Sequence, residues 1–394
     1  MKYELMLRRL LYFAVAITPV IYIVYSGNID LNVYRTGGYA LLHDLRLYAD
    51  DFPSLVPGFA LPFTYPPFAA MLFVPLHLVP RPLADLMIST ASVIALTATM
   101  LVVARRLLGT TRIARYLGLA VVVLAMFLQP VRSNVGFAQV NLILMGLVAV
   151  DCLITRPRWP RGVLIGLAAA IKLTPLVFIL YFLVRRQYRE AATVLGTFAG
   201  ISLVAYALRP IDSTAYWFGV LFSTDRIGGA TYAFNQCFQA VVHRLVPDGP
   251  LQLVIWFVLV LAALVPTLIA ARKARANGDD VTALLVVAVF GLLASPVSWS
   301  HHWVWIAPAV LAIGCHAWRK RNKLTTALSL LVVATFAVGP HVYLDPEGRH
   351  WNFLEHLLGS SYVLIGVAYL VTLAARKSPH VLVSQRLNSE ARIR

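Results

Sequence analysis

Long apolar stretches recur from one end of this chain to the other, and they constrain its fold more than any other feature. Many approach 20 residues, enough for a helix to cross a hydrocarbon core about 30 Å thick. Of the 394 residues, 59% are hydrophobic and only 13% are charged, which is about half the charged fraction of a soluble globular chain. We therefore expect an all-α polytopic membrane protein rather than a set of soluble domains.

The apolar runs predict about 12 transmembrane helices in a single domain, residues 1–375. The first run follows two arginines, as in a signal peptide, but it lacks a small-residue cleavage site, so we expect a retained helix. Pro66-Pro67 opens the segment 66–80, and Lys172-Leu173-Thr174-Pro175 interrupts the segment 163–184. Each of these can enter the membrane without crossing it, which would also move the basic segments 105–115 and 156–161 to the cytoplasmic side. The expected spans are 8–26, 66–80, 84–104, 113–129, 138–154, 163–184, 191–208, 251–271, 281–294, 301–318, 324–340 and 356–375.

Charged residues are divided unevenly between the predicted loops. An inside N-terminus puts three long loops outside the cell membrane, at 27–65, 209–250 and 341–355. These loops hold ten of the 17 acidic residues but only six of the 34 basic ones, as the positive-inside rule requires. The net charge of +17 then reflects cytoplasmic clusters facing lipid headgroups, with a basic tail at 376–394, rather than a nucleic-acid surface. We expect a multi-pass plasma-membrane protein with no nucleic-acid partner.

The cysteine and glycine patterns predict no cofactor. Cys152, Cys237 and Cys315 are scattered and form neither a zinc spacing nor a disulfide framework. The Gly-Gly pairs at 37–38 and 228–229 lack the spacing and the following Lys-Ser/Thr of a phosphate loop. No set of carboxylates accompanies the His-His pair in a metal-ligand pattern. We therefore expect neither a nucleotide nor a metal site.

Two charged residues stand out by position. Asp30 lies just beyond the first predicted span, where a lipid headgroup and a water-borne acceptor can meet; from position alone it equally caps the helix that follows. Lys172 interrupts a strongly apolar segment. An ammonium there is costly unless it faces a cavity or a partner, so an intramembrane lysine indicates a functional site. The alternatives for Lys172 are a buried pair with Asp151 and a snorkelling side chain.

Several short motifs, taken in order, resemble glycosyltransferase family 87. The first is Asp-Leu-Asn-Val-Tyr followed by Thr-Gly-Gly-Tyr-Ala-Leu-Leu. Later motifs include Ile-Lys-Leu-Thr-Pro and Ser-Pro-Val-Ser-Trp-Ser-His-His-Trp. In the family's Asn-Gly-Gln-x-Asn stretch this chain departs, carrying Phe137-Ala138 before the glutamine. The motifs occupy residues 30–34, 36–42, 62–70, 134–141, 170–175, 235–236 and 295–303.

The resemblance implies a membrane glycosyltransferase of the GT-C fold that takes its sugar from a polyprenyl phosphate. Within the family, the chain looks most like the actinobacterial α-1,2-mannosyltransferases of phosphatidylinositol mannoside synthesis. It would then move mannose from polyprenyl-phosphate-mannose to a glycolipid acceptor at the periplasmic face. Arabinofuranosyltransferases and lipomannan-branching mannosyltransferases share these motifs and remain open. A lipid or solute transporter is a further alternative, although no internal repeat favours one.

The implied chemistry assigns roles to a few residues. Inversion at the sugar requires one base, and Asp30 matches the family's loop aspartate. The donor phosphate or a proton relay would use Lys172, His301, His302 or Arg226. The histidines can instead belong to an interfacial Trp/His belt, and Arg226 can form a solvated pair with Asp225.

A further set of residues is assigned to the sugar or the acceptor. These residues carry aromatic or amide side chains that can stack on or hydrogen-bond a sugar, although in loops they can equally satisfy backbone groups. We expect Asn134, Gln139 and Asn141 to bond neighbouring helices instead. The sugar and acceptor candidates are Tyr34, Tyr65, Asn235, Gln236 and Trp299.

Overall fold

The chain is all-helical in the computed structural model. Its only β-type pairing within the described residues is an isolated antiparallel bridge between Asn235 and Trp299. Most of the predicted first span and the predicted tail after Arg376 lie outside the residues that the structure describes. The described residues are 6, 10–18, 28–56, 58, 61–223, 226 and 228–376.

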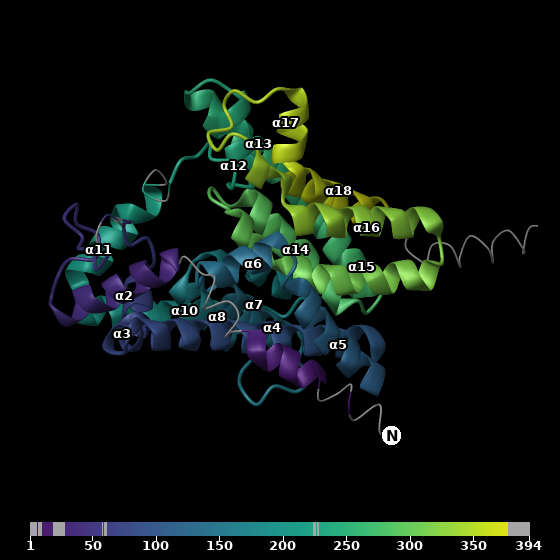
Figure 1. The fold of residues 1–394 in the computed structure, drawn as a ribbon, viewed down its shortest axis with the longest axis horizontal. Helices are drawn as coiled ribbons and strands as arrows, with labels where there is room; N and C mark the ends of the chain where they lie inside the picture. The colour runs from purple at the N-terminus through teal and green to yellow at the C-terminus, as the bar shows by residue number, and fades with distance from the viewer. Residues whose placement is uncertain are drawn as a thin grey trace, which may run out of the picture.

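The helices of the first half of the chain, coloured purple to teal in Figure 1, pack below most of those of the second half, coloured green to yellow. The α-helices are α2 (Ile29–Leu42), α3 (Pro67–Leu78), α4 (Arg81–Leu108), α5 (Arg112–Ala125), α6 (Gln129–Gly136), α7 (Asn141–Leu153), α8 (Val163–Ile171), α9 (Ile179–Val184), α10 (Tyr188–Leu208), α11 (Pro210–Phe218), α12 (Phe238–Leu245), α13 (Pro250–Ala276), α14 (Asp280–Ala294), α15 (Ile306–Lys320), α16 (Lys323–Val338), α17 (Phe353–Gly359) and α18 (Ser361–Ala375). Short 3₁₀ segments include η1 (Thr174–Phe178) and η4 (Ser300–Trp305).

Among the described residues, three helices are long and apolar enough to cross a membrane: α4, α10 and α13. The count rises to five if two bent pairs, α5 with α6 and α17 with α18, each form one span. The bends are 70° and 68°. Most of the other predicted spans correspond to shorter apolar helices. The expectation of a multi-pass helical protein is thus confirmed in this coarser form, while the number of about 12 full spans stays a prediction.

The segment 163–184 is not one continuous helix. Helix α8 ends at Lys172, whose backbone is extended (φ −153°, ψ 130°), and the chain resumes as η1 and then α9. Pro175 has no N–H to donate to the carbonyl of Ile171, four residues before it, and its ring would clash with that carbonyl in a continuous helix. The break therefore places a charged side chain where two helical pieces separate.

Two glycines allow α2 to lie directly on α3 and on Phe63 in the segment before it. A Cβ added to Gly38 would meet the Phe73 carbonyl oxygen at 2.9 Å, and one added to Gly37 would meet the Phe63 ring at 2.6 Å. Only glycine permits such an approach, because every other residue carries that Cβ. The Gly-Gly pair thus fixes α2, and with it Asp30, against the neighbouring helix.

Candidate active site

The first turn of α2 is attached to the end of α6. The backbone N–H of Asp30 donates to the Phe137 carbonyl at 3.1 Å, and that of Asn28 donates to the Gly136 carbonyl at 3.1 Å. N–H groups in a first helical turn have no partner within their own helix. Here the carbonyls at the end of α6 accept from these N–H groups, so Asp30 is held beside the segment 134–141.

Gln139 links Asp30 to two tyrosines. Its Oε1 accepts hydrogen bonds from the hydroxyls of Tyr34 (2.7 Å) and Tyr65 (3.1 Å) and from the Val140 N–H (2.9 Å). Because Oε1 is the acceptor of all three, the Nε2 amide remains as the donor, and the Gln139 side chain hydrogen-bonds Asp30. The buried network therefore orients the carboxylate from one side.

The turn before Gln139 has a strained backbone. Ala138 has φ 56°, in the left-handed region, where glycine is far better tolerated than alanine. Ala138 therefore adopts this turn with a side chain that strains the backbone. The turn carries the chain from α6 towards Gln139 and α7.

Burial raises the pKa of Asp30 to about 7, while the positive charge of Lys172 and the hydrogen bond from Gln139 act in the opposite direction. A carboxyl group in an apolar site favours its neutral form, and a nearby cation favours the charged one. The balance leaves Asp30 able to change protonation state near neutral pH, which suits a general base.

Lys172 lies beside this network and contacts the Tyr65 ring. Its Nζ donates to Asn141 Oδ1 at 3.1 Å and contacts His302 Nε2 at 3.1 Å, and it lies 5.6 Å from the centroid of the Tyr65 ring. An ammonium only donates, so His302 Nε2 must accept, and the imidazole is neutral with its proton on Nδ1. One of the three ammonium protons has no hydrogen-bond partner among the described residues and is free for a ligand oxygen.

The alternative pairing of Lys172 with Asp151 is wrong. Asp151 accepts from the N–H groups of Gly162 and Ile165 at 3.0 and 3.1 Å and from the indole of Trp159 at 3.1 Å. The carboxylate therefore satisfies free N–H groups at the start of α8, about two helical turns from Lys172. Its role is to cap a helix.

The two adjacent histidines have different surroundings, as their neighbouring positions require. His302 reaches Lys172, whereas His301 packs its ring edge-on against Phe137 and has an Nε2 without a partner in the described part of the chain. Asp30, Lys172 and His302 each retain some exposure. Tyr34, Tyr65, Gln139, Asn141 and His301 around them are buried, so within this cluster a substrate can reach these three side chains.

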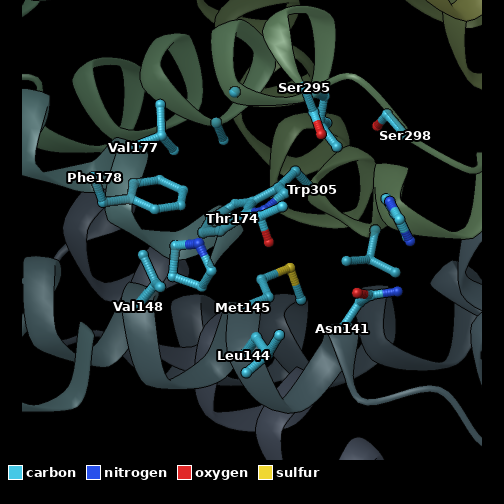
Figure 2. Close-up of a pocket in the computed structure, with 16 residues that line it drawn as sticks. Asn141, Leu144, Met145, Val148, Thr174, Val177, Phe178, Ser295, Ser298 and Trp305 are labelled. Atoms are coloured by element: carbon cyan, nitrogen blue, oxygen red, sulfur yellow. The ribbon is translucent and has the colours of Figure 1, made fainter. Parts of the chain in front are cut away.

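A small cavity adjoins His302 (Figure 2). Asn141 and Ser298 lie on one side of it, and Phe178, Val177 and Val148 on the other. Its volume of about 60 Å³ holds only a few waters, since one water occupies roughly 10–15 Å³ by this measure. The cavity can hydrate His302 but is too small for a monosaccharide, which leaves the exposed side of Asp30 and Lys172 for the sugar.

The other predicted site residues have contacts outside this cluster. Arg226 donates to the Tyr48 carbonyl at 3.3 Å and lies 3.9 Å from Asp50; its suggested partner Asp225 is outside the described residues. Gln236 donates to the carbonyls of Ala233 and Gly359, and Asn235 Oδ1 accepts from the Ser298 N–H. These amides satisfy loop backbone, and the bridge to Asn235 holds Trp299.

Gln139 and Asn141 bond neighbouring helices, as expected: Gln139 accepts from Tyr34 of α2, and Asn141 accepts from Lys172 just past the end of α8. The sequence did not predict that these bonds also place both amides against the candidate catalytic groups. Their place in the 134–141 motif was the only signal in the sequence. Both are almost fully buried, and each forms hydrogen bonds with residues more than 30 positions away in the sequence. Their amides orient Asp30 and Lys172 respectively.

A second contact holds α2 in place. Asn28, whose backbone is left-handed (φ 47°), donates from Nδ2 to Asp85 Oδ2 at 2.5 Å, and Ser89 donates to the other carboxylate oxygen at 3.3 Å. Asn28 and Asp85 are 6% and 3% exposed. The pair therefore joins the start of α2 to the first turns of α4 in a buried setting.

We expect Asp85→Ala to lower the turnover number about tenfold or more with little change in the donor KM. The substitution leaves the buried Asn28 amide without its acceptor, which costs about 1–3 kcal/mol. It also removes a contact that holds the start of α2, so that Asp30 is misplaced. The exchange variant Asn28→Asp with Asp85→Asn keeps one donor and one acceptor and should restore most turnover. Equal losses in both variants, with normal thermal stability, would show that the contact does not position Asp30.

Comparison with known proteins identifies the family. The model of glycosyltransferase family 87 matches residues 63–296, which include Gln139, Asn141 and Lys172. The chain belongs to glycosyltransferase family 87. No solved structure matches it significantly. The family assignment made from the sequence motifs is confirmed.

Mycobacterial relatives cover most of the chain. A polyprenol-phosphate-mannose-dependent alpha-(1-2)-phosphatidylinositol mannoside mannosyltransferase of Mycobacterium tuberculosis is 39% identical over 370 residues, or 89% of this chain and 86% of the relative. The protein of the same description from Mycolicibacterium smegmatis is 39% identical over 367 residues, or 88% and 83%. A phosphatidylinositol pentamannoside mannosyltransferase of Mycobacterium tuberculosis is 36% identical over 297 residues, or 73% and 66%.

Proposed function

We propose that this family 87 protein is a polyprenyl-phosphate-mannose-dependent mannosyltransferase that adds an α-1,2-linked mannose to a phosphatidylinositol mannoside. Identity to the mannosyltransferases over almost nine-tenths of the chain supports the reaction class. The observation that carries the mechanism is that Asp30, hydrogen-bonded by Gln139, lies close enough to Lys172 for the two charges to interact, with Lys172 also against the Tyr65 ring.

Asp30 serves as the general base. The acceptor hydroxyl gives its proton to the Asp30 carboxylate while its oxygen attacks the anomeric carbon of mannose. The bond between that carbon and the phosphate oxygen breaks, and the phosphate keeps the electron pair. One displacement inverts the anomeric centre, so a β-linked donor gives an α-linked product without a second carboxylate.

Lys172 stabilises the leaving phosphate. The charge on the phosphate grows as the glycosidic bond breaks, and a fixed ammonium in a water-poor site stabilises growing charge more strongly than water does. Asn141 and His302 hold the ammonium through neutral partners, so its positive charge is available to the phosphate. The reaction then takes place at the outward face of the plasma membrane, between two lipid substrates.

An apolar groove beside the site suits a lipid-linked donor. It runs between α14, α15, α16 and α18, with a volume of about 910 Å³, and shares Leu292 and Trp305 with the cavity next to His302. Grooves of this size and composition bind extended apolar ligands. We place the isoprenoid chain of the donor here, with its phosphate at Lys172.

The value of kcat/KM should rise with pH through about 7 and level off above it, because only the ionised form of Asp30 takes a proton. Gln139→Met removes a hydrogen bond that stabilises the carboxylate, so the acid limb should move to higher pH. Initial rates across the neutral range measure both profiles. An unchanged apparent pKa in Gln139→Met would show that the acid limb of the pH profile does not report the ionisation of Asp30.

The proposal is tested with purified protein in detergent. Polyprenyl-phosphate-mannose labelled in the sugar and a phosphatidylinositol mannoside acceptor should give a glycolipid longer by one mannose, whose linkage α-1,2-mannosidase removes. A polyprenyl-phosphate-arabinofuranose donor is run beside it. Transfer from the arabinose donor alone would overturn the choice of sugar, and absence of transfer from both donors would leave transport as the better account.

A further inference from the structure

A groove lined by arginines lies at the far end of the bundle from Lys172. It runs between α9 and the last turns of α13. Helix α14 fixes its location: Ser295, just past its end, lines the cavity beside His302, whereas Asp280 at its start pairs with Arg185, next to the groove. Fifteen residues of helix separate these ends, or about 22 Å. The groove is therefore distinct from the candidate active site.

The groove carries positive charge that the protein does not balance. Asp280, next to the groove, already pairs with Arg106 and Arg185. Within the described part of the chain, neither Arg186 nor Arg272 forms an ion pair. Arg275 donates one hydrogen bond to the Val184 carbonyl and keeps its other donors. All three guanidinium side chains are exposed.

The rest of the groove is apolar and borders the lipid-facing surface. Leu180, Leu183 and Leu268 line it beside the arginines. Helices α10 and α13 flank α9, and only 17% of the apolar stretch of each is buried within the protein. Most of both helices must therefore contact membrane lipid. A site with guanidinium groups at one end and leucines along its length matches a phosphate with a hydrocarbon chain attached.

We propose that this groove binds an anionic phospholipid of the bilayer. The phosphodiester contacts Arg186, Arg272 and Arg275, and one acyl chain lies along the leucines. Guanidinium groups bind phosphate through paired hydrogen bonds, and basic pockets at helix ends select anionic headgroups. The lipid is not a substrate, because it lies at the opposite end of α14 from Lys172, and the proposal does not depend on sugar transfer.

The test measures phospholipid binding to the purified full-length protein by native mass spectrometry in neutral detergent. Phosphatidylglycerol, which carries no mannose, is compared with zwitterionic phosphatidylcholine. We expect tighter binding of phosphatidylglycerol, and a loss of about tenfold or more in Arg186→Gln with Arg272→Gln, since each arginine contributes about 1 kcal/mol. The matched control, Arg321→Gln with Lys323→Gln, removes the same charge from the exposed α15–α16 turn and should leave binding unchanged.

Three results would overturn the proposal. Equal weakening in the two double variants would indicate general attraction to a basic surface. Equal affinity for the two lipids would remove the role of charge. Loss of phosphatidylglycerol binding in Lys172→Met would move the lipid to the active site. If the groove double variant is unstable, Arg272→Gln alone serves instead, since its side chain is exposed, and it should weaken phosphatidylglycerol binding while leaving phosphatidylcholine binding unchanged.

Discussion

Replacing Asp30 with asparagine is expected to lower the turnover number about a thousand-fold, within the range that a general base contributes. The amide has nearly the same shape and can still accept from Gln139, but it cannot take a proton from the acceptor hydroxyl. The KM for the donor should change little, because the donor phosphate is held at Lys172. Initial rates with labelled polyprenyl-phosphate-mannose and saturating acceptor measure the loss.

Asp51→Asn is the matched control for this prediction. Asp51 lies in the same predicted loop, and its substitution makes the same change in charge, but its side chain is exposed. We expect near-normal turnover from it. If Asp30→Asn keeps more than about a tenth of the wild-type rate, Asp30 is not the base, and the acceptor proton must leave by another route.

The second large effect is expected at Lys172. Lys172→Met should lower kcat/KM for the donor about 10²–10³-fold, the usual cost of removing one group that stabilises charge in the transition state. The thermal stability of the variant should change little, because methionine removes a charge that is costly in apolar surroundings but leaves the Asn141 oxygen without the donor at Lys172. Donor titrations and a thermal unfolding scan separate the two effects.

Lys273→Met provides the comparison for a lysine that only stabilises the fold. Lys273 Nζ donates to the carbonyls of Ala374 and Arg376, so this substitution should lower the melting temperature and leave donor KM unaltered. The reverse outcome, a strongly destabilised Lys172→Met with normal donor KM, would make Lys172 a structural residue. It would also remove the phosphate site from the mechanism.

The sequence identified single charged residues better than the groups that orient them. Asp30 and Lys172 are conspicuous because charge is rare and costly in apolar surroundings, so each is visible within its own segment. Gln139 and Asn141 are amides at a helix start, and their local sequence equally fits helix–helix bonding. The preference for His302 over His301 and the contact between Asn28 and Asp85 depend on residues 57 to 130 positions apart, which no local pattern encodes.

The chain by itself determined the class of protein and its family, because hydrophobic length is a local property and the motifs are short and ordered along the chain. It also indicated the break in the segment 163–184, because Pro175 acts on its own neighbours in the chain. Only the tertiary structure decided which polar groups meet: the attachment of α2 to the end of α6, the Gln139 network, the neutral partners of Lys172, and the capping role of Asp151. The physical reason is that a hydrogen bond requires atoms within about 3 Å, and packing of distant segments sets that distance.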